Sequence, residues 1–225
     1  MPENPSANLI EYYARRAGEY EEIYHKPERQ EDLARLRADL PPLFCGHDVL
    51  EIACGTGYWT SLIAKRARTV LATDVGEEVL AIARAKAEMP GAVTFARADA
   101  FSLEGVNGAF SAAMVGFWWS HVLLEKRDAF LEVLRTKLMP DALVVMVDNR
   151  HVPDSSTAVC RTDDQGNTHQ LRTLQDGSRF EVVKNYDTQQ SIRTAVDRVG
   201  TLIRFEELEY YWWCAWRMKP RRCHT

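Results

Sequence analysis

The sequence lacks the long apolar segments that mark membrane and secreted proteins. No run of about 18 apolar residues occurs, so we predict no membrane-spanning helix. The N-terminal segment MPENPSANLIEYYARR has no apolar stretch of the kind that forms a signal peptide. We therefore expect a cytoplasmic protein that has no membrane as a partner.

Cysteine is scarce and is never arranged in a C-x-x-C pair. An odd number of scattered thiols fits neither a disulfide framework nor a zinc site, so no metal is predicted. The five cysteines are Cys45, Cys54, Cys160, Cys214 and Cys223.

An excess of positive charge is also missing. Lys and Arg number 28 against 32 Asp and Glu, so the net charge of -4 gives no general attraction to a nucleic acid. No G-x-x-x-x-G-K-[ST] loop is present, which leaves no motif for a P-loop nucleotide site. With 225 residues, of which 46% are hydrophobic, the chain is predicted to fold as one globular domain, as a monomer or a homodimer.

The central part of the chain alternates between strand-like and helix-like segments. Such alternation predicts a parallel sheet covered on both faces, so we expect an α/β, doubly wound, Rossmann-like fold. Two further strands near the C-terminus would give a mostly parallel sheet of seven strands with an antiparallel last strand. The predicted strands are 49–52, 69–73, 93–96, 110–115, 143–147, 202–208 and 210–216, and the helices are 58–67, 77–88, 127–138 and 188–199.

Two segments stand outside this alternation. Residues 8–24 carry aromatic side chains among Glu and Arg and predict an amphipathic helix, followed by a second helix over 31–40. Residues 153–186 contain Asp176-Gly177 between two strand-like runs, which predicts a β-hairpin inserted over the sheet. The domain would comprise an N-terminal helical lid (1–42), a cofactor-binding core (43–150), the hairpin insertion (151–186) and the last helix and strands (187–218).

The strongest local motif is the strand-to-helix turn Val49-Leu-Glu-Ile-Ala-Cys-Gly-Thr-Gly57. Small residues there let the backbone approach a ligand at the carboxyl edge of the sheet. Ala53, Gly55 and Tyr58 occupy the three glycine positions of the dinucleotide fingerprint, which disfavours NAD and FAD. Asp74 and Asp99 end the next two strands, where they can accept hydrogen bonds from a ribose and an adenine, although a strand-end Asp is often only a helix cap.

With these residues the sequence resembles the class I S-adenosylmethionine-dependent methyltransferases, and is similar to small bacterial ubiquinone- and menaquinone-type enzymes. The resemblance is carried by VLEIACGTG, VLATDVGEEVLAIARAKA, FARADAF and AFSAAMVGFWWSHV. It implies S-adenosylmethionine as cofactor, with residues 51–57 at its methionine part, Asp74 at the ribose and Asp99 with Ala100 at the adenine. Ala53 stands where the family usually has glycine, and Pro140-Asp141-Ala142 replaces the common Pro-Gly-Gly turn.

The expected cofactor contacts come from the lid and from the ends of four strands. Tyrosines of the lid helix could cover the cofactor, although packing is an equally good reading for each of them. The full expected set is Tyr13, Tyr20, Tyr24, Glu51, Ala53, Gly55, Gly57, Asp74, Val75, Asp99, Ala100, Phe101 and Gly116.

The acceptor side is expected after the fourth strand. Phe117, Trp118 and Trp119 could enclose an apolar or planar acceptor, whereas strand alternation would place half or more of the aromatic residues in the core. His121 and, second, His151 are candidate general bases. A hydrogen bond to the backbone is the simpler role for His121.

Arg150 is the candidate for pairing with a substrate carboxylate, although an exposed loop arginine is the simpler reading. We expect methyl transfer to a small-molecule acceptor, with oxygen or nitrogen favoured. Two alternatives stay open, a cofactor-binding subunit without catalysis and a protein or RNA methyltransferase. The inserted hairpin would help to select the acceptor or would form a dimer contact.

Overall fold

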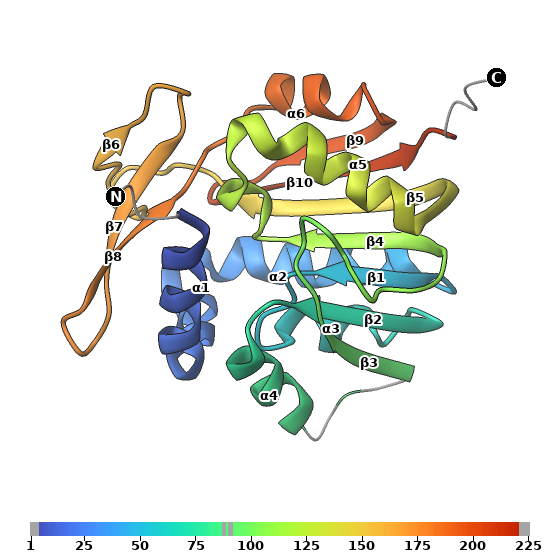
Figure 1. The fold of residues 1–225 in the computed structure, drawn as a ribbon, viewed down its shortest axis with the longest axis horizontal. Helices are drawn as coiled ribbons and strands as arrows, with labels where there is room; N and C mark the ends of the chain where they lie inside the picture. The colour runs from blue at the N-terminus through green and yellow to red at the C-terminus, as the bar shows by residue number, and fades with distance from the viewer. Residues whose placement is uncertain (1–4, 87–88, 90–91, 221–225) are drawn as a thin grey trace.

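A computed structural model describes residues 5–86, 89 and 92–220, and a seven-stranded sheet lies at its centre (Figure 1). The strand order is β3-β2-β1-β4-β5-β10-β9. The first five strands are parallel, and β10 runs antiparallel to both β5 and β9. The bounds are β1 (Asp48–Ile52), β2 (Thr69–Asp74), β3 (Ala92–Arg97), β4 (Phe110–Gly116), β5 (Leu138–Asn149), β9 (Gly200–Glu207) and β10 (Tyr211–Met218). The predicted fold class is confirmed.

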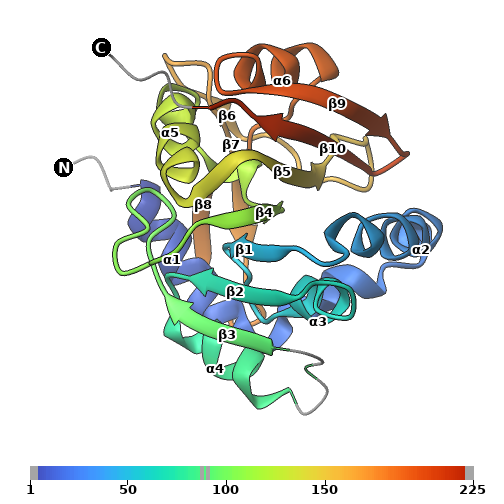
Figure 2. The same ribbon diagram turned by 90° about the vertical axis from the view of Figure 1, so that its right-hand side faces the viewer.

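Helices cover both faces of this sheet because its central strands are apolar on both sides. On one face α5 (Arg127–Lys137) and α6 (Gln189–Val196) bury Phe130 and Ile192 against the sheet. On the other, α2 (Gln30–Asp39), η3 (Pro41–Phe44) and α3 (Tyr58–Ile63) bury Leu36 and Phe44. Figure 2 shows α5 and α6 on the opposite side from α2 and α3. The remaining core helix, α4 (Glu77–Ala85), packs on β2 and β3.

The N-terminal segment is not the single helix expected over residues 8–24. α1 (Pro5–Arg16) ends at Arg16, and the chain tightens into the 3-10 helix η1 (Ala17–His25) and then η2 (Pro27–Arg29). Gly18, a poor helix former, follows the break directly. The tighter turn brings Tyr24 onto the face of Tyr58, with the ring centroids 3.9 Å apart.

Residues 161–183 form the predicted hairpin and one additional short strand. We call this three-stranded unit the inserted sheet; it consists of β6 (Arg161–Thr162), β7 (Thr168–Thr173) and β8 (Arg179–Val183). Gly177 adopts φ 82° at the turn between β7 and β8, as the Asp-Gly signal requires. Leu9 and Tyr12 of α1 pack on Val182, so α1 lies beside β8 at one end of the main sheet (Figure 1).

Several element boundaries differ from those predicted. α3 stops at Ile63 rather than at residue 67, because residues 64–67 form a turn in which Ile63 O accepts from the amides of both Arg66 and Ala67. β5 extends to Asn149 because Asp148 and Asn149 still pair with β10. Within the described residues, no helix combines the length and the apolar character needed to cross a membrane.

Gly200, at the start of β9, is a position where the packing admits no side chain. A Cβ there would lie 2.6 Å from the carbonyl oxygen of Arg217 and 2.7 Å from Cζ3 of Trp216, a fully buried residue. Such overpacking costs about 1–3 kcal/mol. We expect Gly200→Ala to lower the free energy of unfolding by about that amount in urea titrations. Gly18→Ala, where a Cβ would meet nothing within 4 Å, is the control and should not destabilise.

Candidate functional site

A cavity of about 560 Å³ opens at the carboxyl ends of β1, β2 and β4, the edge at which doubly wound sheets bind ligands. We call it the large cavity. Residues 98–101, α1, residues 117–129 and Val183 complete its wall. The wall residues are Leu9, Ile10, Tyr13, Ala14, Ala53, Gly55, Asp74, Val75, Gly76, Val79, Ala98, Asp99, Ala100, Phe101, Phe117, Trp118, His121, Leu123, Lys126, Ala129 and Val183.

The turn after β1 forms one side of the large cavity and is built from unusual backbone. Ala53, Gly55 and Gly57 all have positive φ, at 53°, 55° and 75°. Gly57 has a second constraint, since a Cβ there would lie 3.1 Å from Cβ of Ala83 in α4. Ala53 lacks the conformational freedom of glycine, so its left-handed conformation costs roughly 1–2 kcal/mol. Strained backbone of this kind is concentrated at ligand sites.

Asp74 holds this turn in place from the end of β2. Its Oδ2 accepts a hydrogen bond from the amide of Gly55 and its Oδ1 from the amide of Gly76, both at 2.9 Å. Burial raises the pKa of Asp74, while the two amide donors lower it. A carboxylate has about four lone-pair positions, so acceptor capacity is left for hydroxyl groups in the cavity.

A second carboxylate, Asp99, also lines the large cavity. Oδ1 of Asp99 accepts from the amide of Phe101 at 2.8 Å, which fixes the loop after β3. The Phe101 ring packs edge-on against Trp118 with the centroids 5.9 Å apart. Val79 and Ala100 also line the cavity, and together with Phe101 they form an apolar surface on which a planar ring can pack.

A smaller cavity of about 160 Å³ adjoins the large one, and we call it the second cavity. The two share three wall residues, Tyr13, Phe117 and His121. The other wall residues of the second cavity are Arg16, Ile23, Tyr24, Lys26, Arg29, Asn149, Ser155, Ser156, Thr157, Arg172, Lys184, Tyr186 and Tyr211. A ligand in either cavity would therefore contact these three shared side chains.

The shared wall contains a hydrogen-bonded pair whose proton positions follow from its partners. Nδ1 of His121 lies 2.6 Å from the carbonyl oxygen of Val183, which can only accept, so Nδ1 carries the hydrogen. Nε2 then has a lone pair and accepts from the Tyr13 hydroxyl at 2.9 Å. Burial and the Lys184 ammonium lower the pKa of His121 to about 3, so its ring is neutral near pH 7.

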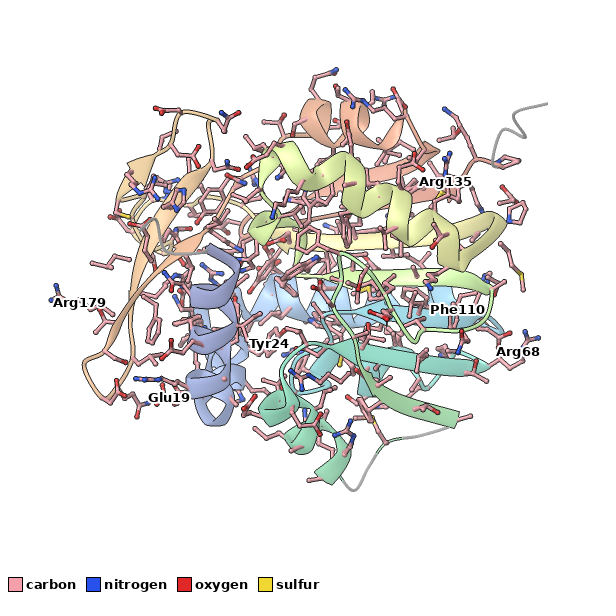
Figure 3. The ribbon with its side chains drawn as sticks, viewed as in Figure 1. Glu19, Tyr24, Arg68, Phe110, Arg135 and Arg179 are labelled. Carbon is pink, nitrogen blue, oxygen red and sulfur yellow. The ribbon has the colours of Figure 1, made fainter. Side chains whose placement is uncertain are left out.

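Most of the expected cofactor residues lie at the large cavity. Tyr13, Ala53, Gly55, Asp74, Val75, Asp99, Ala100 and Phe101 line it. Glu51, Gly57 and Gly116 lie next to it without forming part of its wall. Tyr24 is buried between Tyr58 and Trp59 and lines only the second cavity, and Figure 3 shows it inside the molecule. The side chain of Tyr20 lies outside the described residues.

The structure places some of the predicted acceptor-side residues at the cavities and others elsewhere. Phe117, Trp118 and His121 line the large cavity, but Trp119 points into the core, where Arg127 stacks over its ring at 4.5 Å. Arg150 donates to the carbonyl oxygens of Leu208 and Glu209, so it braces the β9–β10 turn, and it lines neither cavity. His151 is exposed and packs against Tyr186, outside both cavities.

Sequence reasoning missed the polar residues of the second cavity. Arg29 is only 8% exposed and donates to Oδ1 of Asn149 at 3.2 Å and to Oγ of Ser155 at 2.9 Å. Lys184 is buried and binds Oδ1 of Asp148 at 3.0 Å. These residues come from distant segments without a shared motif, and the only local signal was the length of the insertion.

Comparisons with known proteins agree with this geometry. A family model described as "Methyltransferase domain" matches residues 49–141. A solved structure of DhpI with SAH is 27% identical and covers 98% of this chain and 100% of its own, with a TM-score of 0.75. A complex of DhpI with SAM and HEP is 26% identical, with 96% and 99% covered and a TM-score of 0.76. The 1,6-didemethyltoxoflavin-N1-methyltransferase of Burkholderia thailandensis shares the fold at 15% identity, with 98% and 91% covered and a TM-score of 0.64.

Glu51 lies in β1 just before the turn that lines the large cavity. Its protonation state can be tested without a ligand. Burial raises its pKa to about 8, and among the described residues Oε2 has no hydrogen-bond partner. The folded state therefore keeps a proton that the unfolded state loses near pH 4.3, so stability falls as the pH rises between these two values.

Glu51→Gln removes this titration. We expect the stability of the variant, relative to the parent, to increase by roughly 2–4 kcal/mol between pH 5 and pH 8. Urea unfolding at the two pH values measures it, with the exposed Glu104→Gln as control. A difference that does not change with pH would show that Glu51 is ionised in the folded protein.

Proposed function

Because the chain is a class I S-adenosylmethionine-dependent methyltransferase, we propose that it methylates a small-molecule acceptor, on oxygen or nitrogen, in the second cavity. The observation that carries the proposal is the wall of Tyr13, Phe117 and His121 that both cavities share. A donor in one cavity and an acceptor in the other would meet there.

The residues of the large cavity fit the cofactor. Asp74 has acceptor capacity left for the ribose hydroxyls, and the apolar surface of Ala100 and Phe101 beside Asp99 suits the adenine ring. The volume of about 560 Å³ lies in the range of about 300–1,000 Å³ typical of ligand sites. Nε1 of Trp118 is a buried donor with no partner among the described residues, so a polar ligand atom is expected beside it.

The bound cofactor supplies a methyl group activated by a sulfonium centre. The contribution of the protein is to place an acceptor in line with it and to exclude water. α1 and the inserted sheet cover the edge at which the two cavities meet, through Leu9 and Tyr12 on Val182. This cover over the edge of the sheet favours a small acceptor beside the cofactor.

His121 is placed to orient an acceptor rather than to act as a strong base. A ring whose pKa is lowered to about 3 holds a proton poorly near pH 7. The Tyr13 hydroxyl is held by Nε2 of His121, and both residues line both cavities. We assign to Tyr13 and His121 the positioning of the acceptor atom.

The inserted sheet and its flanking residues are proposed to select the acceptor. Ser155, Ser156, Thr157, Arg172, Lys184 and Tyr186 all come from residues 151–186 and all line the second cavity. The plain sheet would leave that side open, so the shape and charge of the second cavity depend on this insertion.

Cofactor binding is tested by replacing Asp74. Asp74→Ala removes the ribose acceptor and leaves the amides of Gly55 and Gly76 unpaired, so we expect S-adenosylhomocysteine to bind at least about tenfold more weakly. Isothermal calorimetry measures this, and the exposed Glu104→Ala serves as control. Unchanged affinity in Asp74→Ala, or no binding by the folded parent, would refute the site assignment.

The role of the shared wall is tested by two neighbouring tyrosines. Tyr13→Phe removes the hydroxyl that His121 holds, whereas Tyr12→Phe changes a buried tyrosine that packs on Phe180. With labelled cofactor and a small-molecule acceptor, we expect kcat to fall at least about tenfold in Tyr13→Phe only, with cofactor affinity kept. Equal kcat values in the two variants would exclude the positioning role, and label found only in protein or RNA would exclude a small-molecule acceptor.

A further inference from the structure

Five cationic side chains converge on the second cavity. No Asp or Glu is among the wall residues, although the chain as a whole carries a net charge of -4. The positive charge is therefore concentrated at this cavity. It comes from side chains at the end of α1, in the segment before α2, in β7 and directly after β8. The five are Arg16, Lys26, Arg29, Arg172 and Lys184.

Two of these charges have a carboxylate partner. Nζ of Lys184 lies 3.0 Å from Oδ1 of Asp148 in a pair that is almost fully buried. Nζ of Lys26 lies 4.0 Å from Oε1 of Glu28, which is a long distance for an ion pair between half-exposed side chains. Only Lys184 is thus neutralised at close range.

The three guanidinium groups have no such neutralisation. Within the described residues, Arg16, Arg29 and Arg172 form no ion pair with a carboxylate. Arg29 is held instead by neutral groups, Asn149 and Ser155, and by the faces of Tyr210 and Tyr211 at 5.2 Å and 5.5 Å. Nε of Arg172 is buried and has no hydrogen-bond partner in the described part of the chain.

The cations also repel one another across the cavity. The pKa of Lys26 is lowered by its burial and then by Arg29, with Arg172 and Arg16 adding to the effect. Burial lowers the pKa of Lys184 despite Asp148, and Arg172 and Arg29 lower it further. Positive charge held together in a partly dry cavity is unfavourable unless an anion binds there.

We propose that the methyl acceptor is a small oxyanion, a carboxylate or a phosphate-type acid, whose acid group binds to Arg29 and Arg172 in the second cavity. This inference rests on the proposed function, because it names the acceptor class of that site. Guanidinium groups suit this ligand, since their planar N–H donors match pairs of acid oxygens. A cationic acceptor, such as a protonated amine, is excluded from the cavity by repulsion.

An ionised acid also suits the chemistry at the shared wall. An oxygen lone pair of the acid forms the new carbon–oxygen bond while the methyl–sulfur bond breaks and leaves its electron pair on sulfur. The product is a methyl ester, and no proton has to be removed. Tyr13 and a neutral His121 therefore suffice at this position, although neither is an effective base near pH 7.

Arg172 of β7 is the best residue to test, because it is half-buried and does not belong to the core. Its matched control is Arg179 at the start of β8, an exposed arginine of the same inserted sheet that Figure 3 shows at its outer side. Arg172→Gln and Arg179→Gln remove the same charge from the chain. Arg29→Lys is a second variant, which keeps the charge but loses the planar donors.

The experiment is calorimetry on the full chain saturated with S-adenosylhomocysteine, titrated with inorganic phosphate and, separately, with acetate at matched ionic strength. We expect at least one probe to bind at one site per chain, about tenfold more weakly in Arg172→Gln and in Arg29→Lys, and unchanged in Arg179→Gln. Whichever probe binds more tightly identifies the acid as phosphate-type or carboxylate.

The inference is overturned if neither probe binds, or if Arg172→Gln and Arg179→Gln bind them equally well. The saturation step separates this failure from a failure of the proposed function, because a protein that does not bind S-adenosylhomocysteine shows it before any anion is added. A transfer assay supplies the second readout. Label transferred to uncharged amides in preference to the corresponding acids would also overturn the proposal.

Discussion

The geometry of the site depends on one buried carboxylate, Asp148, near the end of β5. Its two oxygens accept from the amide and the hydroxyl of Ser120, both at 2.9 Å, and from Nζ of Lys184 at 3.0 Å. Burial alone would raise the pKa of Asp148, but the Lys184 charge and the Ser120 amide lower it. Removing one partner of such a buried pair costs about 3–5 kcal/mol, so this contact is a strong constraint.

This contact ties three separate parts of the chain together. Ser120 belongs to the short helix η4 (Trp119–His121) after β4, Asp148 to β5, and Lys184 follows β8 of the inserted sheet. His121 and Val183, which are the chain neighbours of Ser120 and Lys184, form a further hydrogen bond beside this contact. The shared wall between the cavities is therefore fixed by the main sheet and the inserted sheet together. A second anchor, the paired hydrogen bonds of Arg127 to Asp187 at 2.8 Å, fastens the end of the insertion.

The sequence was sufficient to predict the part of the site that is encoded locally. The turn after β1, with Asp74 and Asp99 at the ends of the next two strands, follows from motif and strand order, and the structure brings Gly55, Asp74 and Asp99 to one cavity. The hairpin turn at Gly177 was also predictable from the local sequence, because the positive φ of this turn favours glycine. The position of Trp119 was harder to predict, because the turn that follows β4 decides whether Trp118 or Trp119 faces the cavity.

The second cavity could not be predicted from spacing in the sequence. Arg29 and Arg172 are far apart in the chain, and tertiary packing, which includes that of α1 on the inserted sheet, brings them to one wall. Arg150 was the arginine that the sequence singled out, but in the structure it donates to carbonyl oxygens of the β9–β10 turn and lines neither cavity. Contacts between the lid and the insertion are determined by the tertiary structure, and no local sequence pattern predicts them.

The central claim is that donor and acceptor meet at Tyr13, Phe117 and His121. A crystal structure of the protein grown with S-adenosylhomocysteine tests it most directly. The account predicts adenosine in the large cavity, between Asp74 and Phe101, with the sulfur atom directed at the shared wall. A ligand whose adenosine occupies the second cavity, or whose sulfur points away from Tyr13 and His121 toward solvent, would contradict it.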